Sequence, residues 1–122
     1  MQDLGQHGDL LDMRTVRQLV KDIGVERTRE YFGYLDAEFA LRSDTILKTF
    51  KELDLEQLAR QTHALKSCVL MAGAVPLCRK LEAIESKAKA GDYDALAQIG
   101  ELFELLKLTS EACRRLNLDD VR

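Results

Sequence analysis

The chain has 122 residues, enough for one domain to bury a hydrophobic core without disulfides or metal ions. Hydrophobic residues make up 46% and charged residues 32%, with seven Gly and one Pro, a composition that favours an ordered helical protein over disorder or a strand-rich fold. The formal net charge is −3 and no basic run exceeds two residues, which argues against nucleic-acid binding through a phosphate-neutralising patch.

Two helices are predicted in the first half of the chain, after a flexible tail at 1–9 that precedes a single domain at 10–122. Asp12 can cap a short helix that Gly24 ends. The apolar stripe of this helix is Val16, Leu19, Val20 and Ile23. A long second helix follows, from about Val25 to Glu52. Spacings of three, four and seven predict its buried face: Phe32, Leu35, Phe39, Ile46 and Phe50.

A third and a fourth helix are predicted on either side of Gly73-Ala74. Asp54 with Gln57 three residues later forms a capping-box pattern that begins the third helix. Its apolar face is Leu55, Leu58, Thr62, Leu65, Val69 and Ala72. Gly73-Ala74 ends it, and Pro76 suits the first turn of the fourth helix. That helix buries Leu77, Leu81, Ile84 and Ala88.

The last helix is expected after Gly91, which ends the fourth helix, and Asp92, which begins the next segment. It runs to about Leu116, and its apolar positions are Leu96, Ile99, Leu102, Phe103, Leu106 and Cys113. Short connections between long amphipathic helices make consecutive helices antiparallel neighbours. The predicted fold is therefore all-α, an antiparallel up-down four-helix bundle with a short additional N-terminal helix.

No part of the sequence indicates export or membrane insertion. The first twenty residues are polar and broken by Gly5 and Gly8, and no apolar run approaches membrane-spanning length. The cysteines occupy apolar helical positions without CxxC spacing: Cys68, Cys78 and Cys113. An odd cysteine count without an export signal predicts reduced thiols, packed as small core residues, in a cytoplasmic protein.

His63 is predicted to be exposed on the third helix. With about 100° per residue, the apolar face of that helix centres between Leu58 and Val69, and His63 points roughly 120° away from it. Lys66 lies one turn after His63, and Arg60 lies one turn before it. These residues form an exposed strip along the helix, which also contains Ser67 and Leu70.

A histidine in this position suits phosphoryl chemistry. Its unperturbed pKa of about 6.5 leaves a neutral nitrogen available to attack phosphorus near pH 7. The Lys66 ammonium can compensate the charge of the phosphoryl group, and the small Ser67 lets a partner approach. The helical wheel by itself is also compatible with a surface histidine that is solvated and has no function. A zinc site is disfavoured because His63 and Cys68 fall on different faces, and no GxSxG motif supports a hydrolase triad.

Several residues together resemble one family, the histidine-containing phosphotransfer (HPt) domain. They are His63-Ala64-Leu65-Lys66, Gly73-Ala74, Leu77, Cys78, Leu81-Glu82 and Gly91-Asp92. The resemblance covers about residues 12–117 and implies the same helical bundle. It implies that His63 is the phosphorylated histidine, that Lys66 stabilises the phosphoryl group and that Gly73 and Ala74 end a helix. Ser67 departs from the glycine usual there. Its side chain narrows the approach to His63 slightly and can donate a hydrogen bond to a phosphoryl oxygen, which bears on rate or partner preference rather than on activity.

The resemblance further implies a phosphocarrier, and we expect it to be monomeric. It would take its group from a phospho-aspartate on the receiver domain of a hybrid sensor kinase and pass it to a response regulator. The receiver would supply Mg²⁺, and this chain has no cofactor of its own. The sequence has no Gly-rich nucleotide loop and no P-loop, so ATP binding and autonomous kinase activity are not expected.

An apolar docking rim around His63 is a further hypothesis. Its members are Leu70, Ala59, Met71 and Ala74. Alternatively, the first helix covers Leu70. Arg60 and Glu56 would tune the association rate through their charges, although a solvated helix face explains Glu56 equally well. Two other functions stay open: a helical adaptor that binds kinase or receiver domains without accepting phosphate, and a phosphotransfer module cut from a larger sensor kinase.

Overall fold

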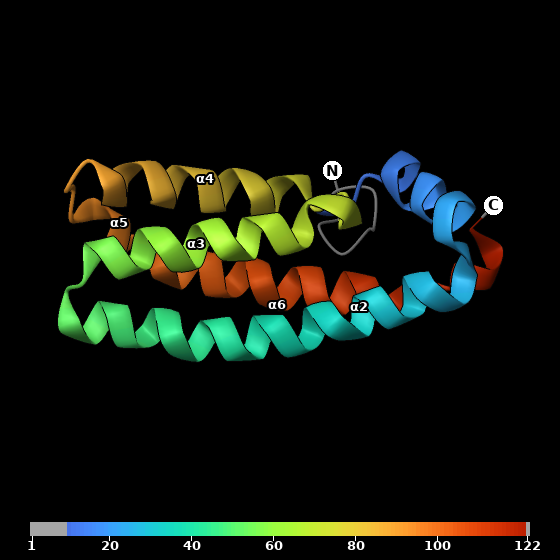
Figure 1. The fold of residues 1–122 in the computed structure, drawn as a ribbon, viewed down its shortest axis with the longest axis horizontal. Helices are drawn as coiled ribbons and strands as arrows, with labels where there is room; N and C mark the ends of the chain where they lie inside the picture. The colour runs from blue at the N-terminus through green and yellow to red at the C-terminus, as the bar shows by residue number, and fades with distance from the viewer. Residues whose placement is uncertain (1–9, 122) are drawn as a thin grey trace, which may run out of the picture.

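The computed structural model describes residues 10–121, which contain helices and short 3₁₀ turns but no strand. The helices are α2 (Met13–Glu52), α3 (Leu55–Val69), α4 (Val75–Lys89), α5 (Asp94–Ala97) and α6 (Ile99–Arg115). The 3₁₀ turns are η1 (Leu70–Ala72) and η2 (Leu118–Asp120). Figure 1 shows the long part of α2 lying beside α3, with α4 on the far side of α3, and α6 packs against both α2 and α4. Successive helices run in opposite directions. The predicted all-α antiparallel bundle is confirmed.

The short N-terminal helix is the first part of α2. Gly24 breaks the helical backbone with φ 88° and ψ 165°, so the residues before it turn away from the axis of the long arm. Figure 1 shows this blue segment folded back across one end of the bundle. The Thr28 hydroxyl donates a hydrogen bond of 2.7 Å to the Gly24 carbonyl and anchors the start of the long arm. The predicted end of a short helix at Gly24 is therefore confirmed.

The predicted caps are formed. The Asp12 carboxylate accepts a hydrogen bond from the Arg14 backbone N–H at 3.0 Å, and the Asp54 carboxylate accepts one from Gln57 at 3.0 Å. Pro76 lies in the first turn of α4. These contacts satisfy backbone groups at helix starts, which have no partner within the helix. Capping is a local property, so the sequence pattern is enough to predict it.

Three details differ from the predictions. Phe50 is 46% exposed because it lies in the last turn of the long arm, where the chain leaves the bundle to enter α3. Ile23 is 36% exposed because it directly precedes the break at Gly24. The predicted last helix is divided at Gln98 into α5 and α6, because the chain must first cross from α4 toward α6 at the end of the bundle.

The core is mostly aliphatic and formed by side chains from all the long helices. Its largest fully buried members are Leu11, Leu35, Ile46, Leu58, Leu65, Leu77, Leu81, Ile84 and Leu102. No helix within residues 10–121 is both long and apolar enough to cross a bilayer. The predicted flexible tail at 1–9 lies outside the described residues, and the single domain at 10–122 stays a prediction.

Gly73 joins the N-terminal segment to the turn between α3 and α4. Its carbonyl accepts a hydrogen bond of 2.7 Å from the Asp12 backbone N–H. Its backbone is left-handed, with φ 70°. A Cβ at this position would lie 2.9 Å from the Asp12 carbonyl oxygen and 2.9 Å from Thr15 Cβ. The close approach of the two segments therefore requires glycine.

Gly73→Ala is expected to lower the free energy of unfolding more than Gly91→Ala. Both glycines are left-handed, which costs an L-residue about 1–2 kcal/mol, but a Cβ at Gly91 would meet nothing within 4 Å. The clash at Gly73 should add about 1–3 kcal/mol. Urea unfolding of the two variants measures the difference. Equal losses would show that the N-terminal segment shifts to accommodate the added methyl group without lowering the stability further.

Candidate functional site

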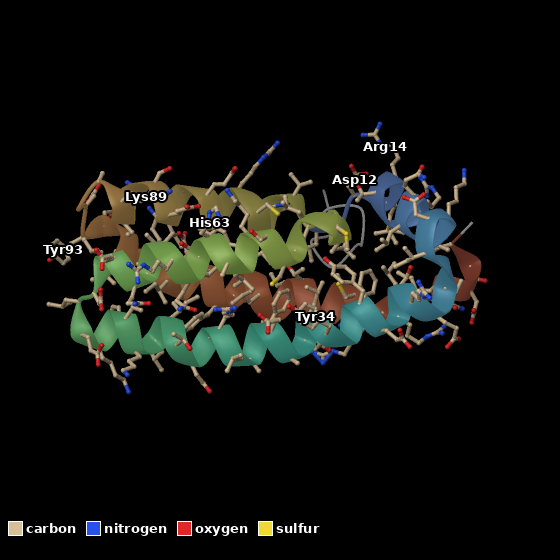
Figure 2. The ribbon with its side chains drawn as sticks, viewed as in Figure 1. Asp12, Arg14, Tyr34, His63, Lys89 and Tyr93 are labelled. Atoms are coloured by element: carbon tan, nitrogen blue, oxygen red, sulfur yellow. The ribbon has the colours of Figure 1, made fainter. Side chains whose placement is uncertain are left out.

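His63 lies on the exposed side of α3, about midway along the bundle (Figure 2). Its side chain is 60% exposed, which confirms the prediction from the helical wheel. The neighbouring face of α3 is buried through Leu58, Leu65 and Val69. Packing of that face holds the helix in place and leaves the imidazole outside the core.

Glu85 on α4 orients the imidazole. Its Oε2 lies 2.9 Å from His63 Nδ1, and its side chain is only 7% exposed. Burial raises the pKa of this carboxyl, but hydrogen bonds from Lys89 and His63 outweigh it and leave the pKa below its usual value. An ionised carboxylate can only accept, so Nδ1 must carry the proton. The lone pair of the neutral ring is therefore on Nε2.

Two lysines surround the same carboxylate. Lys89 Nζ lies 2.9 Å from Glu85 Oε2, while Lys66 Nζ lies 3.7 Å from Oε1. Lys66 also lies 3.6 Å from Glu82 Oε2 and is 21% exposed, less than a free surface lysine. The site thus combines one imidazole with cations from α3 and from α4. Lys66 was predicted at this place, whereas Glu85 and Lys89 were not.

The other polar residues of the strip lie beside His63 but make contacts within their own helix. Arg60 is exposed and pairs with Glu56 at 3.6 Å. The Ser67 hydroxyl donates to the His63 carbonyl at 3.2 Å. Its proton is therefore used inside α3, and the hydrogen bond expected from Ser67 to a phosphoryl oxygen would require this contact to break. The side chain remains small and exposed next to the imidazole.

The predicted apolar rim is partly wrong. Leu70 is 58% exposed and Met71 is 52% exposed, so the N-terminal segment does not cover Leu70. Ala59 and Ala74 are buried, at 7% and 1% exposure. Ala59 faces the seam with α4, and Ala74 lies in the turn against which the N-terminal segment packs. Val75 is exposed next to that turn and extends the rim instead.

All three cysteines are free thiols. Cys113 is buried, and burial is the main cause that raises its pKa to about 12. Cys68 and Cys78 are only half-buried, so they are more exposed than the predicted packing as core residues requires. Across residues 10–121, no group of three or more His, Cys, Asp or Glu side chains is placed to hold a metal ion.

An exposed imidazole with its lone pair on Nε2, which shares its carboxylate partner with two lysines on a four-helix bundle, is the arrangement expected of a helical carrier of phosphoryl groups. The Hpt domain family model matches residues 25–115. The chain is also 34% identical over 99 residues to the phosphorelay protein LuxU of Vibrio cholerae, an alignment that covers 76% of this chain and 83% of that protein. It is 30% identical over 111 residues to LuxU of Vibrio harveyi, covering 87% of this chain and 94% of that protein. No solved structure matches significantly.

The chain therefore belongs to the Hpt domain family and is a histidine phosphotransfer protein of a phosphorelay. The partners of such a carrier are receiver domains. The family was identifiable from the spacing of the His-x-Leu-Lys and Gly-Ala motifs. The pair Glu85 and Lys89 carried a weaker signal, an i,i+4 pair on the fourth helix, which by itself does not say which helix it faces.

Proposed function

We propose that His63 is the phosphoacceptor. It takes a phosphoryl group from the aspartyl phosphate of a receiver domain in a hybrid sensor kinase and passes it to the aspartate of a response regulator. The observation that carries this proposal is the contact between Nδ1 and Glu85, which leaves a lone pair on Nε2 of an exposed ring. A carrier needs an accessible nucleophile that is already in the reactive tautomer.

The transfer forms one bond and breaks one bond. The Nε2 lone pair attacks phosphorus, while the phosphorus–oxygen bond of the acyl phosphate breaks and its electron pair returns to the partner's aspartate as a carboxylate. The proton stays on Nδ1, so the phosphorylated ring carries a positive charge. Glu85, whose carboxylate already accepts from that N–H, stabilises the charge. The reverse sequence delivers the group to the response regulator.

The cationic side chain of Lys66 supports the phosphoryl group in this proposal. Charge stabilisation and in-line positioning are the main requirements of phosphoryl transfer, so few groups are needed from the carrier. The receiver supplies the acidic pocket and Mg²⁺. The carrier itself neither binds ATP nor acts as a kinase.

Docking of the receiver is proposed on the exposed rim beside the imidazole. Leu70, Met71 and Val75 present apolar area, and Leu70 and Val75 line a hollow together with Lys66. Arg60 and Ser67, which lie on α3 with His63, are proposed to belong to the same docking surface. The charge of Arg60 would raise the rate of association with a receiver whose surface is acidic. We further propose a monomeric cytoplasmic protein.

The proposal is tested by mixing the protein with a phosphorylated receiver domain. The expected product is a phosphoprotein whose linkage is acid-labile and base-stable, as a phosphorus–nitrogen bond requires. A receiver that binds the chain but never transfers its label would favour the adaptor function. An acid-stable linkage would place the group on a residue other than histidine.

A further inference from the structure

Tyr31, on the long arm of α2, holds the end of α3. Its hydroxyl donates a hydrogen bond of 2.6 Å to the backbone carbonyl of Cys68, and the backbone N–H of Ala72 hydrogen-bonds to the same hydroxyl. In a continuous α-helix these two backbone groups would bond to each other, because residue 72 is four positions after residue 68. The tyrosine hydroxyl therefore lies between them at the point where α3 gives way to the 3₁₀ turn η1.

The surroundings of Tyr31 favour this contact. The side chain is half-buried and packs against the core of the bundle. Burial is the main cause that raises the pKa of Tyr31 well above its usual value, so the hydroxyl keeps its proton and can donate it to the carbonyl at neutral pH. Carbonyls in the last turn of a helix have no partner within the helix, and α3 satisfies one of them with a residue 37 positions away in the chain.

The turn η1 carries two residues of the proposed docking rim, Leu70 and Met71, and both are exposed. On its other side the turn ends at Gly73, whose carbonyl accepts a hydrogen bond of 2.7 Å from the Asp12 backbone N–H. Contacts from the chain before α3 therefore hold the turn at both ends, Tyr31 at its start and Asp12 at its end. The direction in which the rim faces depends on these two contacts.

We propose that Tyr31 is a positioning residue for receiver docking, because its hydroxyl fixes η1 so that Leu70 and Met71 are presented beside His63. The proposal rests on the docking surface of the proposed function. Tyr31 acts through the backbone of the turn and not on the reacting atoms. Without the hydroxyl, the carbonyl and the N–H that it joins lose their common partner, and η1 is free to fray or to rejoin α3. Either change moves the rim relative to the imidazole.

The test compares two phosphoryl donors on a Tyr31→Phe protein. Phosphoramidate, a small donor that needs no docking, should phosphorylate His63 as fast as in the unmodified protein. With a phosphorylated receiver domain that labels the unmodified protein, the receiver concentration at half-maximal rate should rise about threefold to tenfold, as for the loss of one hydrogen bond. The rate at saturation should stay the same, because a docked receiver restores the turn. Amide hydrogen exchange should accelerate within η1 but not at the centre of α3.

Tyr34→Phe is the matched control. Tyr34 also lies on α2 (Figure 2), but its hydroxyl meets the sulfur of Cys68, at 3.6 Å, and not its carbonyl. This variant should leave the kinetics with both donors unchanged. A Tyr31→Phe protein that behaves like Tyr34→Phe would overturn the proposal, and so would an equal loss of rate with phosphoramidate. No labelling of the unmodified protein by either donor would overturn the proposed function itself.

A protein without the rim separates positioning of the rim from other effects of Tyr31. When Leu70→Ala and Met71→Ala are combined, the turn presents no large apolar side chain, so the hydroxyl has nothing left to position. Adding Tyr31→Phe should then leave the half-maximal receiver concentration unchanged, since residues that act as a unit are not additive. A further rise by a similar factor would show that Tyr31 acts independently of the rim. A rimless protein that docks as tightly as the unmodified one would overturn the docking surface and this proposal, but not His63 as the acceptor.

Discussion

A protein carrying His63→Gln is expected to take up no phosphoryl group from a phosphorylated receiver, a loss of at least about a hundredfold in labelling. The amide of glutamine has no nucleophilic lone pair on nitrogen, because that pair is delocalised into the carbonyl. Glutamine can still donate a hydrogen bond to Glu85, and the replaced side chain is 60% exposed. The fold should therefore be unchanged, which circular dichroism and urea unfolding check.

His7→Gln provides the matched control, since the chain contains only two histidines. This variant should be labelled as fully as the unmodified protein. Labelling with phosphoramidate and with a phosphorylated receiver should give the same pattern, because the acceptor is the same in both. Equal labelling of the His63→Gln protein would contradict the assignment of the phosphoacceptor.

Glu85→Ala is expected to slow phosphoryl transfer about tenfold to a hundredfold, the cost seen when a histidine that binds a metal loses the partner that orients its ring. Without the carboxylate, the hydrogen bond that Nδ1 donates to Glu85 is lost, so the proton distributes between the two ring nitrogens and the nucleophilic tautomer is diluted. The positive charge of the phosphorylated ring also loses its counter-charge. Both changes follow from one contact of 2.9 Å between α3 and α4.

Glu85→Gln separates these two effects. Its side-chain carbonyl can still accept from Nδ1, so ¹⁵N NMR of the imidazole should show the proton mainly on Nδ1, as in the unmodified protein. Its rate should lie between those of Glu85→Ala and the unmodified protein, because the counter-charge is absent. If the Glu85→Ala protein keeps both the tautomer and the rate, Glu85 contributes only to packing between α3 and α4.

Much of the bundle and the place of His63 in it could be predicted from the sequence, because these depend on local chemistry. Asp12 and Asp54 cap helices through backbone groups two or three residues away. The helical repeat assigns His63 to the face opposite the buried one, and packing of that face is enough to expose the imidazole. The break at Gly24 likewise follows from one residue.

Periodicity was less informative at the ends of helices. It places Phe50 and Ile23 on the apolar side, but burial also needs another element to cover that side, and neither residue has full cover where the chain turns. The opposite error concerns Ala74. It follows the helix-ending Gly73 and was expected at the surface, yet the N-terminal segment packs on that turn and Ala74 is buried.

The sequence by itself determined the helices, their caps and an exposed His63 with Lys66 one turn away, since each depends on residues close together in the chain. Only the tertiary structure decided that Glu85 meets Nδ1 and that Lys89 shares its carboxylate. That meeting depends on the register in which α3 packs against α4, a property of two surfaces in contact. Because the register selects the ring nitrogen that keeps its proton, it also selects the nitrogen that would accept phosphate in the proposed transfer.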